Sequence, residues 1–167
     1  PPIPGVDLEG VFPILKDADH LRGMQERLKT ARDLVVVGGG FIGIEFADEL
    51  RKTGIQTITI VEIAPHCLSL SYDEEFCLEA EMVLQSNGIR IRTASKVEAF
   101  IGPGRVTGVK LSGGEILPAD AVVLGIGSRA CVELGRAAGL RIGATGAVDV
   151  DRSMRTSDPN IFACGDC

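Results

Sequence analysis

The hydrophobic positions in the first half of the chain alternate between strand-like and helix-like spacing. A continuous apolar run at 34–37 is typical of a strand buried on both faces. The residues at 56–62 are rich in β-branched side chains and predict a second strand, and those at 89–93 predict a third. Because apolar residues recur at helical spacing between these runs, the pattern indicates a β-α-β-α-β unit.

Two amphipathic helices are predicted on either side of the first strand. The earlier one lies within 17–29, where Asp17 or Asp19 is suited to cap its start, and the later one ends at Gly54. Each carries an apolar stripe at helical spacing, formed by Leu21, Met24 and Leu28 in the earlier helix and by Ile42, Phe46 and Leu50 in the later one.

A third helix is predicted between the second and third strands. Ser71 and Glu74 have the spacing of a capping box, and Asn87 with Gly88 ends the helical pattern. Four apolar residues are expected on the inner face of this helix, namely Phe76, Ala80, Val83 and Leu84.

From residue 97 the pattern changes to short alternating runs separated by glycines. The segment 97–118 is typical of an antiparallel meander with hairpin turns. A further buried strand is predicted at 121–127 and a short helix at 132–138. The predicted fold class is therefore α/β, a Rossmann-like doubly wound parallel sheet with an inserted antiparallel β-meander.

The loop after the first predicted strand has the spacing Gly38-x-Gly40-x-x-Gly43 and opens a helix. Gly38 permits a tight turn, Gly40 lets the backbone approach a pyrophosphate, and Gly43 allows close packing of helix and strand. The helix N-terminus would offer free N–H groups and the positive end of its dipole to the anion. Glycines serving packing alone are the alternative, but the strand before the loop and the helix after it favour dinucleotide binding.

An acidic residue follows at the end of the next predicted strand. The carboxylate of Glu62 would accept hydrogen bonds from the adenosine ribose hydroxyls and would repel a 2′-phosphate. No Arg or Lys lies between Glu62 and Ser71 to neutralise such a phosphate. The sequence therefore predicts binding of NAD(H) rather than NADP(H).

Several blocks of the sequence resemble the pyridine nucleotide-disulfide oxidoreductases. They are VVVGGGFIGIEFADEL, ITIVE, AVVLGIGSRA and GAVDVDRSMRTSDPNIFACGDC, and PPIPGVDLEGVF is similar to the segment by which that family's chain leaves its FAD domain. The resemblance covers essentially every residue. It is closest to the branch of NADH oxidases, NADH peroxidases, coenzyme A-disulfide reductases and related persulfide or ferredoxin reductases. It implies hydride transfer from NADH to FAD, followed by reduction of a disulfide, persulfide, peroxide or oxygen.

The resemblance implies a role for each matching residue. Glu45 would lie near the nicotinamide, Phe41 would cover the flavin until the nicotinamide displaces it, and Asp166 would bind FAD. The pyrophosphate would be cradled by Gly38, Gly40 and Gly43 with the backbone of Phe41 and Ile42, while Glu62 would hold the ribose. Gly125, Ile126 and Gly127 would line the nicotinamide side, which also agrees with ligand binding beyond the carboxyl ends of parallel strands. No catalytic residue is expected in this chain. After Gly127 the sequence departs from the Arg-Pro-Asn common in relatives, so the details of that turn are not implied.

The resemblance also implies a domain organisation. Residues 1–10 would connect from an FAD domain, 11–128 would form the NAD(H)-binding domain, and 129–167 would begin the return to the FAD domain. The FAD domain, the redox-active cysteine and a dimer-forming interface domain would lie outside this chain. We therefore expect a fragment of a homodimeric parent that binds NADH without turnover.

Composition limits the classes of partner that the chain is expected to bind and the cellular compartment in which it is expected to lie. A net charge of −6 argues against nucleic-acid binding, and the longest apolar run, at 34–44, is too short to span a bilayer. The chain opens without a secretion signal. Its five cysteines, an odd number, do not form a secreted disulfide framework, which favours the cytoplasm.

The remaining reactive side chains are interpreted as structural. Cys164 and Cys167 have the C-x-x-C spacing of a dithiol centre, but they follow a strand-like run instead of opening a helix. Asp166 between them is the residue to which the resemblance assigns a function. Three further cysteines are predicted to be inert small hydrophobes and both histidines to be surface residues that bind no metal: Cys67, Cys77 and Cys131, and His20 and His66.

Two other functions stay open. A stand-alone NAD-dependent dehydrogenase would need an acid–base group in the cleft, and the sequence has no Tyr-x-x-x-Lys pair, with Tyr72 its only tyrosine. Alternatively, the single glycine loop could bind FAD itself in a flavoprotein core. The visible absorption of a purified sample would distinguish that function from NADH binding.

Overall fold

The computed structural model describes residues 3–127 and 129–167. Residues up to Gly127 form one compact unit, and those from 129 onward form a second. The first unit carries the glycine loop and the acidic residue that follows it.

A parallel sheet is the centre of the first unit. Within the described residues its strand order is β1-β8-β2-β3-β4. Val37 at the end of β2 is in register with Val61 on β3 and with Leu124 on β8, so the carboxyl ends of these strands meet at one edge. The strands are β1 (Val11–Pro13), β2 (Asp33–Val37), β3 (Thr57–Val61), β4 (Arg90–Arg92) and β8 (Ala121–Leu124).

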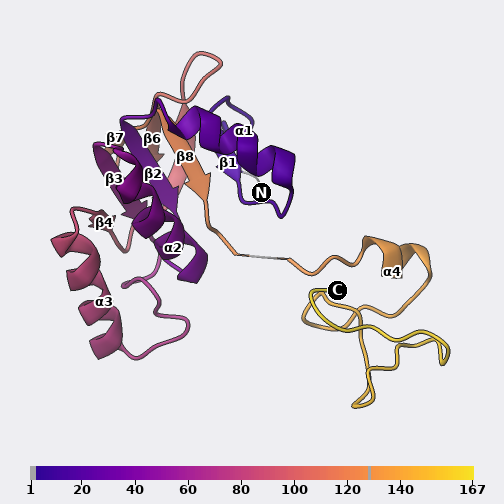
Figure 1. Ribbon diagram of the computed structural model, residues 1–167. Helices are drawn as coiled ribbons and strands as arrows, with labels where there is room; N and C mark the ends of the chain where they lie inside the picture. Colours follow the sequence, from indigo (N-terminus) through magenta and orange to yellow (C-terminus); the bar gives the residue numbers. More distant parts are fainter. Residues whose placement is uncertain (1–2, 128) are drawn as a thin grey trace. The chain divides into compact units, whose positions relative to one another are not determined.

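The helices of the first unit pack on one face of this sheet. In Figure 1, α1 (Ala18–Leu28) and α2 (Phe41–Leu50) lie in front of the strands; the short 3₁₀ turn Arg51–Thr53 follows α2, and α3 (Glu74–Ser86) precedes β4. Their buried side chains form one cluster with every second strand residue, including Met24, Leu28, Leu34, Val36, Ala47, Ile60, Leu84 and Val123. This alternation follows from the two-residue period of a strand.

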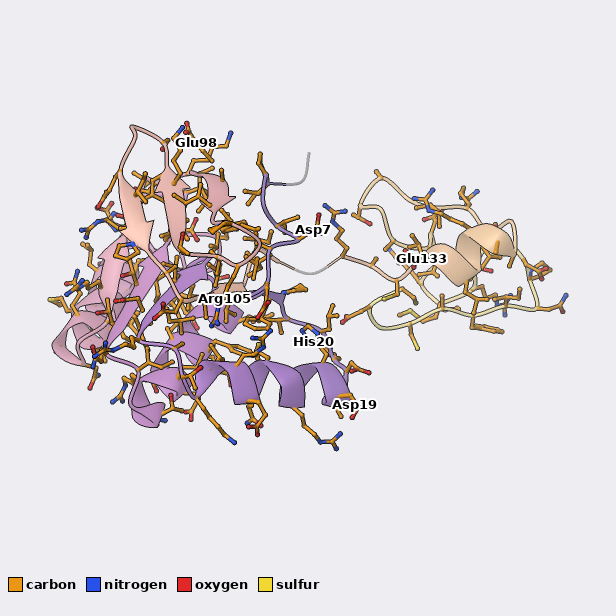
Figure 2. All side chains as sticks on the ribbon, turned by 90° about the horizontal axis from the view of Figure 1, so that it is seen from above. Asp7, Asp19, His20, Glu98, Arg105 and Glu133 are labelled. Carbon is orange, nitrogen blue, oxygen red and sulfur yellow. The ribbon has the colours of Figure 1, made fainter. Side chains whose placement is uncertain are left out.

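The antiparallel meander covers the opposite face. It consists of β5 (Val97–Ile101), β6 (Gly108–Leu111) and β7 (Ile116–Pro118), paired in the order β5-β6-β7. Figure 2 shows Glu98 of β5 and Asp19 of α1 on opposite sides of the parallel sheet. The remaining strand residues pack against the meander in a second cluster, including Val35, Val37, Phe100, Val109, Leu111, Val122 and Leu124. The predicted fold class is confirmed, and the meander occupies the face that helices cover in a doubly wound sheet.

The second unit is smaller and has little regular structure. It contains α4 (Glu133–Ala137) and isolated β-bridges between Ile142 and Val148 and between Arg155 and Phe162. The backbone N–H of Cys131 donates to the carbonyl of Asp166 at 2.7 Å, which ties the end of the chain to the start of this unit.

The start of α1 agrees with the sequence. The extended residue Asp17 caps the helix, and its carboxylate accepts from the His20 N–H at 2.7 Å. The ring nitrogen Nε2 of His20 lies 2.7 Å from the Pro13 carbonyl, which joins α1 to β1.

The prediction for α3 was wrong at its start and only partly right on its inner face, where Leu84 is buried as predicted. The N–H groups of Ser71 and Tyr72 donate to the Leu68 carbonyl in a turn, so the helix begins later, with Asp73 as N-cap. The buried residues of α3 are Cys77 and Leu84, while Phe76 and Val83 are more than half exposed.

The stripe predicted for α2 also needs correction. Phe46 and Leu50 pack against the core, but Ile42 is 44% exposed, and the fully buried positions are Gly43 and Ala47. Small residues lie there because α2 approaches the strand ends at backbone distance. Gly54 ends the 3₁₀ turn after α2 in a left-handed conformation, close to the predicted helix end.

Candidate functional site

Three backbone segments meet at the carboxyl edge of the sheet. Gly38, with φ of +105°, follows β2, and a β-carbon there would lie 2.4 Å from the Gly125 carbonyl oxygen after β8. A β-carbon on Gly43 would lie 1.9 Å from the Gly38 carbonyl oxygen. The Gly38 N–H donates to Val61 at the end of β3, and the Gly125 N–H donates to Val37. Only glycines allow this approach, so the spacing of the motif has a steric cause.

Gly40 differs from the other glycines of the motif because it faces open space. No described atom lies within 4 Å of the position that its β-carbon would take. Gly40 is the N-cap of α2, and no side chain in the described part of the chain caps it. The first N–H groups of α2 therefore donate to no N-cap side chain, and the pyrophosphate prediction places the anion next to them.

Glu62 lies directly after β3 and bridges two loops. Its Oε2 accepts from the Gly39 N–H at 2.5 Å, and its Oε1 accepts from the Ala64 N–H at 2.7 Å. The side chain is half-buried. Because a carboxylate offers about four lone-pair sites, these two bonds leave acceptor capacity for ribose hydroxyls.

The predicted nicotinamide side lies beside the glycine loop. A β-carbon on Gly125 would lie 3.0 Å from the Gly43 Cα. Ile126 is 61% exposed, and Gly127 has a positive φ of 95°. The structure thus brings Gly125, Ile126 and Gly127 to the same edge as the glycine loop. Ser128, in the stretch that departs from the family pattern, lies outside the described residues.

The side chains of α2 that the resemblance assigns to the nicotinamide are exposed. Phe41 is 56% exposed and Glu45 also faces solvent. The Phe41 ring contacts Tyr72 edge-to-face at 5.8 Å, and Tyr72 lies 6.5 Å from Phe76. The sequence analysis missed this aromatic cluster, since its three residues come from α2, α3 and the loop before α3.

A groove of about 800 Å³ lies between α2 and α3. Its lining includes Phe41 and Glu45 with Ile44, Phe76 and Val83, but none of the motif glycines and not Glu62. The groove therefore adjoins the candidate nucleotide cradle and is separate from it.

Asp166 belongs to the second unit. Its backbone carbonyl accepts from the Cys131 N–H. Its role in FAD binding stays a prediction, as do the roles of the other predicted site residues.

The cysteines fall into two groups. Cys67 and Cys77 are fully buried, and burial raises the pKa of both thiols, that of Cys67 to about 12 with added repulsion from Glu81 and Glu62. These thiols stay neutral near pH 7, as expected for inert residues. Cys131 and Cys164 are exposed, so the interpretation of Cys131 as a packed hydrophobe was wrong. All five cysteines are free, including Cys167.

The side chain of His66 is less exposed than predicted for a surface residue. Its side chain is 25% exposed and lies between two carboxylates of α3, with Nε2 3.7 Å from Glu74 Oε1 and Nδ1 3.5 Å from Glu81 Oε2. Within residues 3–127 and 129–167, no group of three or more acidic, His or Cys side chains could hold a metal ion.

The comparison with known families decides the classification. All residues, 1–167, match the sequence pattern of the family described as pyridine nucleotide-disulphide oxidoreductase. The chain belongs to this family. A relative from Methanocaldococcus jannaschii, named NADH oxidase, is 34% identical over 170 residues, covering 100% of this chain and 37% of the relative.

Solved structures of family members show the same fold. The NAD-dependent persulfide reductase from A. fulgidus is 36% identical and superimposes with a TM-score of 0.92, covering 100% of this chain and 31% of the reductase. A water-forming NADH oxidase from Lactobacillus brevis, bound to NADH, is 28% identical with a TM-score of 0.89, covering 99% of this chain and 36% of the oxidase. The chain thus spans between 31% and 37% of the length of these three relatives.

Among the described residues, every helix is too short or too polar to cross a bilayer. The predicted absence of nucleic-acid and membrane partners stays a prediction.

Proposed function

We propose that this chain is the NAD(H)-binding domain of an FAD-dependent NADH oxidoreductase. The observation that carries the proposal is the junction of Glu62 with the glycine loop, where one carboxylate contacts the Gly39 N–H beside the open space at Gly40. This arrangement offers N–H groups to a pyrophosphate and carboxylate oxygens to the neighbouring ribose.

In the proposed complex the dinucleotide lies across the carboxyl edge of the sheet. The pyrophosphate lies at the N-terminus of α2, against Gly40 and the backbone of Phe41 and Ile42. The adenosine ribose lies at Glu62, on the β3 side. The nicotinamide extends toward 125–127 after β8, with Phe41 and Glu45 nearby. This chain binds and orients NADH, which is the larger part of a protein's contribution to cofactor chemistry.

Glu62 accounts for the proposed choice of nucleotide. A 2′-phosphate on the ribose would bring negative charge against a carboxylate that is already fixed by two backbone N–H groups. Because Glu62 is held in place, it cannot swing away without losing both hydrogen bonds. NADPH is therefore expected to bind more weakly than NADH.

The flavin completes the proposed reaction. FAD would accept the hydride of NADH and pass electrons to a disulfide, persulfide, peroxide or oxygen. Asp166 is the residue of this chain proposed to contact FAD, and the rest of the flavin site belongs to the parent's FAD domain. A homodimeric parent in the cytoplasm is part of the same proposal, and the five unpaired cysteines support a reducing compartment.

Calorimetric titration of the purified chain tests the proposal. NADH is expected to bind at least about tenfold more tightly than NADPH, and Glu62→Gln is expected to reduce that ratio, because it removes the repelling charge and keeps an acceptor oxygen. Glu49→Gln, at an exposed position of α2, serves as the control. Equal affinities in the wild type, no binding of NADH, or stoichiometric flavin on the purified chain would each overturn the proposal.

A further inference from the structure

Gly39, the central residue of the glycine loop, is held at three points. Its N–H donates to Glu62, and its carbonyl accepts from the Leu68 N–H at 2.9 Å. The position that a β-carbon would take on Gly39 lies 2.6 Å from the Cys67 sulfur. The segment Cys67–Leu68 therefore forms the support on which the glycine loop rests.

This supporting segment has an unfavourable backbone conformation. Leu68 has a φ of +62°, a left-handed conformation that is disfavoured for residues with a β-carbon. Its carbonyl accepts from the N–H groups of Ser71 and Tyr72, which closes the turn before α3. A segment in such a conformation needs contacts that keep it in place.

Glu81 on α3 supplies one of these contacts. Its Oε1 accepts from the Cys67 N–H at 2.7 Å, and its side chain is only 12% exposed. Its other oxygen faces His66, whose buried Nδ1 makes no hydrogen bond with any described residue. A carboxylate this deeply buried is stable only where donors face it, and the Cys67 N–H is the donor in direct hydrogen-bond contact.

These contacts form a continuous connection from α3 to the candidate nucleotide site. Glu81 holds the Cys67 N–H, the adjacent Leu68 N–H holds the Gly39 carbonyl, and the Gly39 N–H is bound to Glu62. We propose that Glu81 is a positioning residue for nucleotide binding, which fixes the Gly39 peptide and the Glu62 carboxylate through the Cys67–Leu68 segment. This inference rests on the proposed function of the chain as an NAD(H)-binding domain.

Two substitutions separate the hydrogen bond of Glu81 from its charge. Glu81→Gln keeps an acceptor oxygen at the same reach and removes the charge. Glu81→Asp keeps the charge but is one methylene shorter, so its carboxylate cannot reach the Cys67 N–H in the same geometry. NADH affinity is expected to stay within about threefold in Glu81→Gln and to fall by about tenfold in Glu81→Asp, as for one lost charge-assisted hydrogen bond.

A matched control distinguishes positioning from general stability. Leu84→Ala empties a core position on the same helix and is expected to lower the melting temperature, while leaving NADH affinity unchanged at temperatures where the variant is folded. Affinity for ADP-ribose is expected to fall in Glu81→Asp by the same factor as affinity for NADH, because the glycine loop and Glu62 are proposed to bind the ADP-ribose half. Equal NADH affinity in wild type and Glu81→Asp, or a larger loss in Glu81→Gln than in Glu81→Asp, would overturn the inference.

Amide hydrogen exchange provides a readout that needs no nucleotide. In Glu81→Asp the amides of Gly39, Cys67 and Leu68 are expected to lose protection selectively, whereas in Leu84→Ala they are not. If the wild-type chain binds no NADH, the proposed function fails, and unchanged protection of these amides in Glu81→Asp would separately refute the positioning role. If NADH binds and the selective loss of protection occurs without any loss of affinity, the inference alone is refuted.

Discussion

The glycine loop at 38–43 and the cysteine-containing end at 164–167 are both short motifs with a familiar spacing, but their surroundings differ. The glycine loop joins a strand whose last four residues are buried to a ten-residue helix, and its residues contact backbone from two neighbouring strand ends. At the other motif, Cys164 is exposed and, among the described residues, the Cys167 thiol donates to the Cys164 carbonyl at 3.3 Å. The spacing of a motif therefore predicts chemistry only where the fold holds the motif residues in a geometry that few other residue types could adopt.

The largest effect is expected from Gly43→Ala. The added β-carbon would lie 1.9 Å from the Gly38 carbonyl oxygen, so α2 must move away from the strand ends. We expect a loss of about 3 kcal/mol or more in the free energy of unfolding, measured by chemical denaturation. Gly165→Ala, in the cysteine motif, is the comparison; its β-carbon meets no described atom, and its only strain is a φ of +90°. A Gly43→Ala variant as stable as the wild type would contradict the steric account.

Gly40→Ala is expected to act on binding instead of folding. Its φ of −77° suits alanine and no described atom lies near the new β-carbon, so the free energy of unfolding should change by less than about 1 kcal/mol. The methyl group would occupy the space proposed for the pyrophosphate, and NADH affinity should fall at least about tenfold, as measured by calorimetry. Unchanged affinity would place the pyrophosphate elsewhere.

These two glycines also show what a sequence can predict about the site. The spacing of Gly38, Gly40 and Gly43 after an apolar run is a local pattern. The structure places Gly38 in the turn after β2, Gly40 at the N-cap of α2 and Gly43 within α2. Glu62 was recognised in the same way, because it follows a strand with a clear β-branched signal. The positions of the glycine loop and of Glu62 could be predicted because each directly follows a buried parallel strand, which the sequence pattern identifies.

The elements that the sequence analysis missed depend on distant partners. Strand β1 is three residues long and ends in Pro13, so only its pairing with β8 identifies it as a strand. The start of α3 follows the turn at 68–72, where a left-handed leucine cannot be anticipated from its side chain. The contact of Glu81 with Cys67 joins a helix to a loop and leaves no periodic signal.

A moderate loss in the free energy of unfolding is expected at high pH. The thiol of Cys67 has a pKa of about 12 in the folded chain against an ordinary value of 9.0, so the unfolded state loses its proton first. The stability contributed by the neutral thiol is fully present below pH 9 and is lost as the pH rises toward 12, by about 1 kcal/mol at pH 10. Denaturation curves at several pH values measure this loss.

Cys67→Ala provides the control for the pH dependence. Without this thiol the decline above pH 9 should become shallower, with a residual slope from the buried Cys77, whose thiol pKa burial also raises. An identical pH dependence in wild type and Cys67→Ala would show that the Cys67 thiol is not held neutral beneath the glycine loop.

The smallest effect is expected from the cysteine motif. The double variant Cys164→Ser and Cys167→Ser should bind NADH with the affinity of the wild type, because the proposed dinucleotide site is built from residues 38–43, Glu62 and 125–127. Calorimetry in the presence of a thiol reductant measures this. A several-fold change in affinity would assign Cys164 and Cys167 a role in binding and would remove the contrast between the two motifs.

The most direct test of the central claim is a titration with NADH followed by backbone amide chemical shifts. Binding at the glycine loop predicts that the largest shift changes occur at 39–42 and at Glu62, with the amides of 164–167 nearly unchanged. No change at the glycine loop with saturating NADH, or larger changes at 164–167 than at 39–42, would contradict the account.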